Sequence, residues 1–329
     1  MSSANRHKPV RARSSESTYS LMEFMREFPN DAACLEHLWR ETYSEDGEHA
    51  VCPKCKCERV FRKYKTAQGR QSWTCTGCGH HVHPTAGTIF HKSSTSLHLW
   101  FYAMYLVAST RCGISAKNLE RAIGVSYPTA WRMLNKIRNE VMVDDGEPLT
   151  GEVEIDEMSV DGKPRKPHGY NRYAPTPDPN RRSEAQKLRE RSRATVFAAV
   201  ERGGRVKATV LPSRRGPGLQ AQAIEWIDPQ SIVYTDEWPA YNQLHRHFAS
   251  HSRINHSTGE YVVGDIYTNT IEGWFGNVKP SIRGTYRKVS HKWLQGYLNE
   301  FAWRYNRREQ RDPSMFAELV TQAAQGSTL

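Results

Sequence analysis

The chain has 329 residues, enough for two or three modules and at least one sizeable core. Lys and Arg number 46 against 35 Asp and Glu, and this net charge of +11 favours a polyanionic partner, either nucleic acid or an anionic membrane face. The most apolar run, residues 97–108, is shorter than the ~18 residues of a membrane-spanning helix, so we expect no membrane partner. The basic N-terminus lacks the apolar segment of a secretory signal, which predicts a cytoplasmic protein with reduced thiols.

The first 48 residues predict a disordered arm followed by two helices. Residues 1–18 are polar, basic and rich in serine, a composition typical of disorder. Residues 19–48 carry apolar side chains at helical spacing, and Pro29 separates the two helices. Either Asn30 or Asp31 is the expected N-cap of the second helix.

Residues 49–92 predict a zinc ribbon. Cys52-Pro-Lys-Cys55 and Cys75-Thr-Gly-Cys78 are two CxxC pairs separated by nineteen residues, and each pair can aim two thiolates at one ion. Four ligands close the site, so the expected Zn²⁺ is structural. The alternative is four buried or reactive cysteines without metal. Nearby side chains leave the ligand count open, namely Cys57, His80, His81 and His83.

Residues 93–148 predict a helical region with a helix-turn-helix. Ser115 is the expected N-cap of a helix that Gly124 ends, and a second helix starts near Ser126 with Pro128 in its first turn. This arrangement suits reading of the major groove, and an ordinary αα-hairpin is the alternative. The outward residues of the second helix, which are the candidates for DNA contact, are Tyr127, Thr129, Arg132, Asn135 and Lys136.

From residue 149 the sequence changes to short β-rich runs that alternate with helices. Strands are expected at 153–160, 195–200, 206–211 and 232–235, and helices at 219–227, 268–279 and 291–306. Residues 163–193 form a basic, proline-containing insertion, which is either a solvated loop or a contact to DNA phosphates. Residues 311–329 are left as a C-terminal tail.

Three acids in this region form a pattern. Alternation along the first strand places Asp156 on the same face as Glu152 and Glu154, and Asp236 ends a strand, where a carboxylate can hold a metal over the sheet edge. Glu272 follows Asp236 after 35 residues, and Lys279 lies two helical turns beyond it on the same face.

One such acid alone is most simply a solvated surface residue. Hard oxygen ligands at three points, however, can hold two Mg²⁺ or Mn²⁺ ions about 3.5–4 Å apart. One ion activates an attacking water or 3′-hydroxyl and the other stabilises the leaving oxygen. The pattern therefore predicts phosphodiester chemistry, with Lys279 placed to contact the DNA backbone.

The sequence resembles the DDE transposases of bacterial insertion sequences, in the insertion-sequence 1595 family. Beside the ribbon, the resemblance rests on Gly87-Thr-Ile-Phe-His-Lys-Ser-Ser94, Glu154-Ile-Asp156-Glu157, Thr235-Asp236-Glu237, Thr268-Asn269-Thr-Ile-Glu272-Gly273, Ile282-Arg-Gly-Thr-Tyr286 and the run from Tyr297 to Arg307. It implies a multidomain α+β or α/β protein in which residues 149–310 form a ribonuclease-H-like domain, a five-stranded mixed sheet flanked by helices.

The same resemblance implies a function and further site residues. The function is strand cleavage and transfer of a mobile element, with double-stranded DNA (terminal repeats and target) as partner, a homo-oligomer as the active complex, and a place at the bacterial nucleoid. Members of the family are often described with Asn as the third catalytic residue, so Asn269 stands beside Glu272 as a candidate. Arg283 is a further candidate for DNA contact.

Two other functions remain open. One is a nuclease or resolvase of the same fold that cuts DNA without joining it. The other is a zinc-ribbon and helix-turn-helix regulator whose catalytic domain is inactive. The presence of all three acids argues against the inactive regulator. An assay for strand transfer distinguishes the nuclease or resolvase from a transposase.

Overall fold

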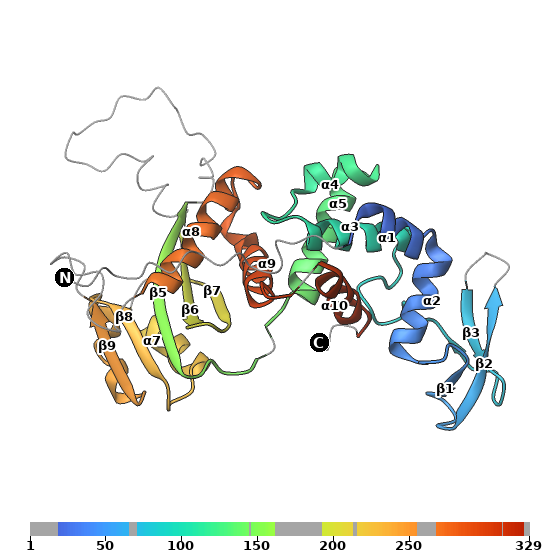
Figure 1. The fold of residues 1–329 in the computed structure, drawn as a ribbon, viewed down its shortest axis with the longest axis horizontal. Helices are drawn as coiled ribbons and strands as arrows, with labels where there is room; N and C mark the ends of the chain where they lie inside the picture. Colours follow the sequence, from blue (N-terminus) through green and yellow to red (C-terminus); the bar gives the residue numbers. More distant parts are fainter. Residues whose placement is uncertain are drawn as a thin grey trace, which may run out of the picture. The chain divides into compact units, whose positions relative to one another are not determined.

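A computed structural model describes residues 19–65, 71–144, 146–161, 193–212, 216–254, 268–310 and 312–325. The predicted basic arm 1–18 and almost all of the insertion 163–193 lie outside these residues. The chain divides into two compact units (Figure 1), of which the first comprises Met1–Met142 with Arg307–Leu329, and the second comprises Val143–Asn306.

Four helices of the first unit share an aromatic core. They are α1 (Leu21–Glu27), α2 (Asp31–Thr42), α3 (Leu97–Ser109) and α10 (Asp312–Ala324). Phe24, Phe28 and Phe101 each lie within 6.3 Å of the Phe316 ring of α10. The predicted C-terminal tail therefore contains a helix that packs with N-terminal elements.

The N-cap of α2 is Asn30, whose side chain accepts from the backbone N–H groups of Ala32 and Ala33. Asp31, the other candidate, instead accepts from the backbone N–H of His98 at the start of α3, at 2.8 Å. The two adjacent polar residues thus cap two different helices, and Asp31 joins α2 to α3.

The cysteine-rich segment forms a small antiparallel sheet. Its strands are β1 (His49–Val51), β2 (Glu58–Lys65), β3 (Gln71–Cys75) and β4 (His81–Val82), in that order. The indole rings of Trp39 from α2 and Trp73 from β3 stack at 4.9 Å and are both fully buried. This sheet is therefore anchored on α2.

The predicted hairpin of helices is present as α4 (Ala116–Ile123) and α5 (Tyr127–Lys136), which continues into a π-helical turn, Ile137–Val141. The Ser115 hydroxyl accepts from the backbone N–H of Asn118 and caps α4. Gly124 ends α4 with a φ of +71°, which an L side chain rarely adopts. Ser126 precedes α5 and Pro128 lies in its first turn.

The second unit is built on a five-stranded mixed sheet. Its strands are β5 (Glu152–Asp161), β6 (Arg193–Glu201), β7 (Val206–Leu211), β8 (Ile232–Asp236) and β9 (Ser250–Ile254). Their order is β7-β6-β5-β8-β9, in which β6 is antiparallel to β5 and β7, and β8 is parallel to β5 and β9. The sequence predicted the first four strands and missed β9.

Helices cover both faces of this sheet (Figure 1). One face packs on α8 (Asn269–Gly284) and α9 (Leu294–Asn306), which follows a short 3₁₀ turn, His291–Trp293. The other face packs on α7 (Gly216–Trp226) and on the 3₁₀ turns Pro239–Tyr241 and Leu244–Arg246. Along β5, Met158 and Val160 face α8, whereas Val153 and Ile155 face α7. Side-chain alternation therefore decides which helices each β5 residue meets.

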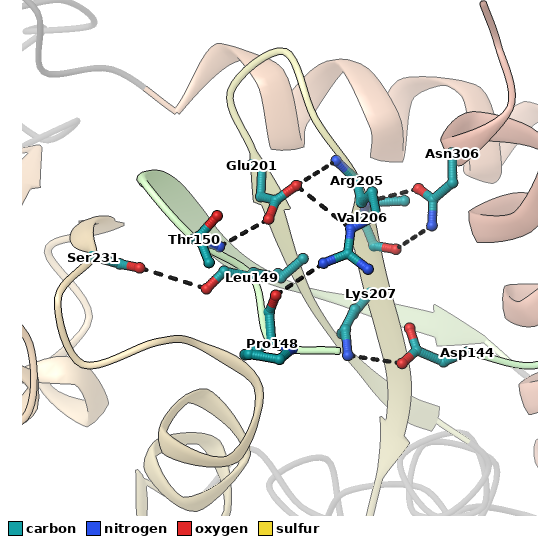
Figure 2. Close-up of polar contacts among 10 residues, drawn as sticks. All are labelled: Asp144, Pro148, Leu149, Thr150, Glu201, Arg205, Val206, Lys207, Ser231 and Asn306. Atoms are coloured by element: carbon teal, nitrogen blue, oxygen red, sulfur yellow. Dashed lines mark hydrogen bonds and ion pairs between the residues drawn. The ribbon is translucent and has the colours of Figure 1, made fainter. Parts of the chain in front are cut away.

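The start of β5 is held by polar contacts to the β6–β7 hairpin (Figure 2). Lys207 is only 4% exposed and contacts Asp144 at 2.7 Å, and the Arg205 guanidinium donates to the carbonyl of Pro148. Glu201 accepts from the backbone N–H of Thr150 at 2.8 Å. These contacts hold the segment before β5, the strand that carries Asp156, against the β6–β7 hairpin.

Candidate active site

Asp156 and Asp236 lie on adjacent strands. In the parallel ladder Glu152 is opposite Ile232 and Glu154 is opposite Tyr234, so the register continued by two residues sets Asp156 beside Asp236. Residues in register on neighbouring strands point to the same face of a sheet. For Asp156 this is the face covered by α8, because Met158 two residues later packs there.

Negative charge converges on Asp156. Burial raises the pKa of Asp156 to about 7, and the charges of Glu157, Asp236 and Glu272 add to this effect. One Asp156 oxygen accepts from the backbone N–H of Glu157 at 2.7 Å, which opposes the rise. Burial and the repulsion between like charges both disfavour the ionised form, so Asp156 binds a proton more readily than an isolated Asp does.

The two candidates for the third ligand lie in the first turn of α8. Asn269 begins the helix and is exposed, and Glu272 follows one turn later. The Thr268 hydroxyl contacts a Glu272 carboxylate oxygen at 3.3 Å. Glu272 is near enough for its charge to raise the pKa of Asp156. Asn269 is neutral, so its distance from Asp156 cannot be judged from this pKa.

Basic side chains continue along α8 away from these acids. Lys279 and Arg283 are both exposed and four residues apart, so they share one face of the helix. The Lys279 ammonium lies 5.7 Å from the centre of the Phe275 ring, which is buried beneath it. Helix α8 therefore carries Glu272 in its first turn and the basic residues Lys279 and Arg283 towards its C-terminal end.

Two further acids of β5 are buried, which the sequence analysis did not predict. Glu154 has no exposed surface and Glu157 is 8% exposed. On the α7 face, the Tyr241 hydroxyl donates to Glu157 at 2.5 Å, and burial together with the Glu157 charge raises the pKa of Tyr241 and keeps it protonated. The burial of Glu157 could have been predicted from the sequence, because alternation places it on the same strand face as the apolar residues Val153 and Ile155.

The donor set fits divalent cations. Asp156, Asp236 and Glu272 offer carboxylate oxygens, the hard ligands that Mg²⁺ and Mn²⁺ prefer, and the pKa of Asp156 is raised first by burial and then by the charges of neighbouring acids. Within the described residues, the group of three or more acid, His or Cys side chains close enough to share one ion is the cysteine cluster. The three candidate acids Asp156, Asp236 and Glu272 are not drawn together that tightly.

The cysteine cluster has the arrangement of a four-thiolate site. The Sγ atoms of Cys52, Cys55, Cys75 and Cys78 all lie within 4.8 Å of one another. In both knuckles the residue after the second cysteine has a positive φ, 58° at Lys56 and 71° at Gly79. Cys57 is exposed and lies outside the cluster. The nearby histidines His80, His81 and His83 are also outside the cluster, which therefore consists of four cysteines.

The candidate DNA-contact residues of α5 differ in exposure. Tyr127 and Arg132 are exposed, whereas Thr129, Asn135 and Lys136 are half-buried. The Lys136 ammonium lies 3.4 Å from both the carbonyl of Ile89 and a Glu140 carboxylate oxygen. Asn135 accepts from the amide of Asn139 at 3.1 Å. Arg132 and Tyr127 are therefore the more accessible members of this set.

None of the helices in the described part of the chain is long and apolar enough to cross a membrane.

Comparison with known proteins gives four findings. The ISXO2-like transposase domain matches residues 148–306, within the second unit. An uncharacterized protein in transposable element ISH50 of Halobacterium salinarum is 29% identical over 257 residues, covering 77% of this chain and 84% of that protein. An uncharacterized transposase-like protein of Haemophilus influenzae is 31% identical over 117 residues, covering 35% of this chain and 94% of that protein. A solved structure, the crystal structure of the Mos1 strand transfer complex, is 12% identical over 64% of this chain and 76% of that one, with a TM-score of 0.19.

The motifs around Asp156, Asp236 and Glu272 fall within the matched domain, on strands β5 and β8 and on helix α8. The Haemophilus relative is matched over almost its whole length. The resemblance stated from the sequence is thereby confirmed, and the chain belongs to the ISXO2-like transposases of the insertion-sequence 1595 family.

Proposed function

We propose that the second unit is a ribonuclease-H-like catalytic domain that cleaves DNA at the ends of an insertion sequence and joins the 3′-hydroxyl ends to target DNA. The observation that carries the proposal is the register of β5 and β8, which sets Asp156 beside Asp236 beneath the helix that bears Glu272. Within a transposase family, three acids around one sheet face are best explained as the centre of the phosphoryl transfer.

The divalent cations would be held by Asp156 and Asp236, with Glu272 or Asn269 as the third ligand. Bound Mg²⁺ or Mn²⁺ supplies an activated oxygen nucleophile and neutralises the charge that develops on the leaving oxygen. The pKa of Asp156 is raised to about 7, so part of the protein holds a proton on this carboxyl near neutral pH. Binding of a cation by Asp156 therefore requires the loss of that proton. Lys279 and Arg283 bind phosphates and orient the strand along α8.

Recognition of the element's ends is assigned to the first unit, with α5 as the helix that enters the major groove. Arg132 is exposed on α5 and can pair with guanine through two N–H groups. Two ends must be held together for transfer, so we also propose that the active complex is a homo-oligomer. The target DNA then contacts the catalytic face of the second unit.

The direct test is a joining assay with the full-length protein. A duplex with the element's terminal repeat and a free 3′-hydroxyl is incubated with plasmid in Mg²⁺, the repeat being identified from DNA that flanks the gene. Covalent joining to the plasmid is the expected result. Cleavage without joining would favour a nuclease or resolvase, and specific binding without cleavage would favour a regulator.

We expect DNA affinity to fall steeply with salt, because Lys and Arg contacts to phosphates release counterions. Arg132→Ala should weaken binding to the terminal repeat by about 1–3 kcal/mol while changing binding to random DNA far less. Arg132→Lys is the matched variant, because it keeps the charge and loses the paired N–H geometry. Binding curves at several salt concentrations measure both effects. Equal losses on both DNAs would contradict base reading by Arg132.

Metal analysis should find one Zn²⁺ per chain, held by the four cysteines of the cluster. Cys75→Ser should release the ion and unfold the small sheet, because the buried thiolate closes a site whose binding energy folds the module. Cys57→Ser is the control and should keep the ion, since Cys57 is exposed and outside the cluster. A zinc-free protein with native circular dichroism would disprove the assignment.

A further inference from the structure

Glu154 is a buried acid two residues before Asp156, on the same face of β5. Position alone would make it a fourth candidate ligand for the catalytic cations. Its side chain is fully buried, and a buried carboxylate must be paired or hydrogen-bonded to remain charged. Its partners decide what this acid does.

Four donors occupy the two oxygens of Glu154. Oε1 accepts from Nε of Arg202 at 2.9 Å and from the Thr270 hydroxyl at 2.9 Å. Oε2 accepts from the backbone N–H groups of Thr270 at 2.8 Å and Ile271 at 3.0 Å. A carboxylate offers about four lone-pair sites, so these donors use its full capacity. Glu154 therefore has no oxygen left for a metal ion.

Three of these donors belong to the first turn of α8, and two of the three are backbone N–H groups. The N-cap residue of this helix, Thr268, provides no side-chain cap, so the first backbone N–H groups need another acceptor. Glu154 provides it from a strand more than one hundred residues earlier. Its negative charge at the positive end of the helix dipole strengthens the contact. One carboxylate thus fixes the helix start to β5.

Arg202 extends this junction to β8. Its guanidinium lies 4.0 Å from the centre of the Tyr234 ring, and Tyr234 precedes Asp236 by two residues. Glu154 likewise precedes Asp156 by two residues and is opposite Tyr234 in the ladder. The Glu154–Arg202 pair therefore lies next to both aspartates along their strands and contacts all three elements that carry the candidate ligands, β5, β8 and α8.

We propose that Glu154, held by Arg202, is a positioning residue that sets the first turn of α8, and with it Asn269 and Glu272, at the distance from Asp156 and Asp236 that catalysis requires. This inference rests on the proposed function of the acids. Glu154 itself contacts neither the cations nor the DNA.

The test compares Glu154→Gln with Glu152→Gln in the full-length protein. Glu152 is on the same strand and also contacts Arg202, at 2.5 Å, but it is 45% exposed and bonds only to Arg202 among the residues of this junction. Glu154→Gln should reduce the single-turnover cleavage rate by roughly 10- to 100-fold, because a small misplacement of catalytic groups has that effect. DNA affinity should be unchanged, and a higher Mg²⁺ concentration should be needed for half-maximal rate.

Hydrogen exchange at the Thr270 and Ile271 amides separates positioning from other roles. It should become faster in Glu154→Gln and stay unchanged in Glu152→Gln. A slow Glu154→Gln enzyme with unchanged exchange would mean that Glu154 acts directly in the reaction, and equal rates in the two variants would mean that it has no role in catalysis. Either result overturns the proposal.

A milder variant covers the case in which Glu154→Gln does not fold. Thr270→Val removes one donor to Glu154 and leaves the backbone contact, so it should shift the Mg²⁺ requirement in the same direction and by less. An unshifted requirement in folded Thr270→Val would then count against the proposal. If the wild-type protein shows no Mg²⁺-dependent cleavage, the proposed function fails, and the exchange measurement still decides whether Glu154 fixes α8.

Discussion

Asp236→Ala is expected to reduce cleavage and joining by on the order of 10³-fold or more, because loss of an ion or its misplacement removes several kcal/mol of transition-state stabilisation. DNA binding should hold or become tighter, since a negative charge next to the phosphates is lost. Gel-shift and cleavage assays on the same preparation measure the two effects. Glu225→Ala is the matched control, because it removes an exposed acid of α7 on the other sheet face.

Asp156 should behave in the same way towards activity, with an additional effect on stability. Its pKa of about 7 is above the unfolded value, so the folded protein binds the extra proton between about pH 4 and 7. That contribution is present below the unfolded pKa and is lost as the pH rises through 7. Asp156→Asn removes the repelling charge, so the metal-free variant should have a higher Tm than wild type above pH 7 and lose that advantage near pH 4.

Calorimetry without added Mg²⁺ or Mn²⁺ at pH 8 and pH 4 measures this difference. An inactive variant with a raised Tm at pH 8 would show that Asp156 is kept for chemistry at a cost in stability. Full activity of both the Asp156 and the Asp236 variants would contradict the transposase chemistry.

Local pattern was sufficient for most of the elements. Alternation in β5 and apolar runs in β6, β7 and β8 are strong β signals, and Ser115 and Gly124 bound α4 as the sequence predicted. Strand β9 was missed because its sequence, Ser-His-Ser-Arg-Ile, has no apolar alternation. It lies at the edge of the sheet, where a strand can form with few apolar side chains. Helix α10 was left in the tail, because its apolar face is explained by contacts with helices more than 200 residues earlier, such as those of Phe316 with Phe24 and Phe101.

The site shows the same division. That Asp236 ends a strand could be read from the sequence, and the register then sets it beside Asp156. The burial of Glu154 could not be predicted, because its partners Arg202 and Thr270 lie 48 and 116 residues away. Glu154, which the sequence placed only on the same strand face as Asp156, accepts in the fold from the first backbone N–H groups of a distant helix.

The third ligand is the remaining choice, and its variants should differ strongly. We expect Glu272→Ala to be as inactive as Asp236→Ala, and Asn269→Ala to keep substantial activity, because the charge at Glu272 reaches Asp156 and the Thr268 hydroxyl holds its carboxylate. Glu272→Asp should rescue little, since the shorter side chain misses the ion.

Glu272→Gln tests whether a neutral amide oxygen is sufficient at this position, as it would be if Asn269 were the ligand. Cleavage rates across a Mg²⁺ titration rank the four variants, with hydrogen exchange at the first turn of α8 as the check that the helix start is intact. An active Glu272→Ala together with an inactive Asn269→Ala would assign the third ligand to Asn269. The charge of Glu272 would then serve mainly to raise the pKa of Asp156, and Glu272→Ala should lower the pH at which Mg²⁺ binds.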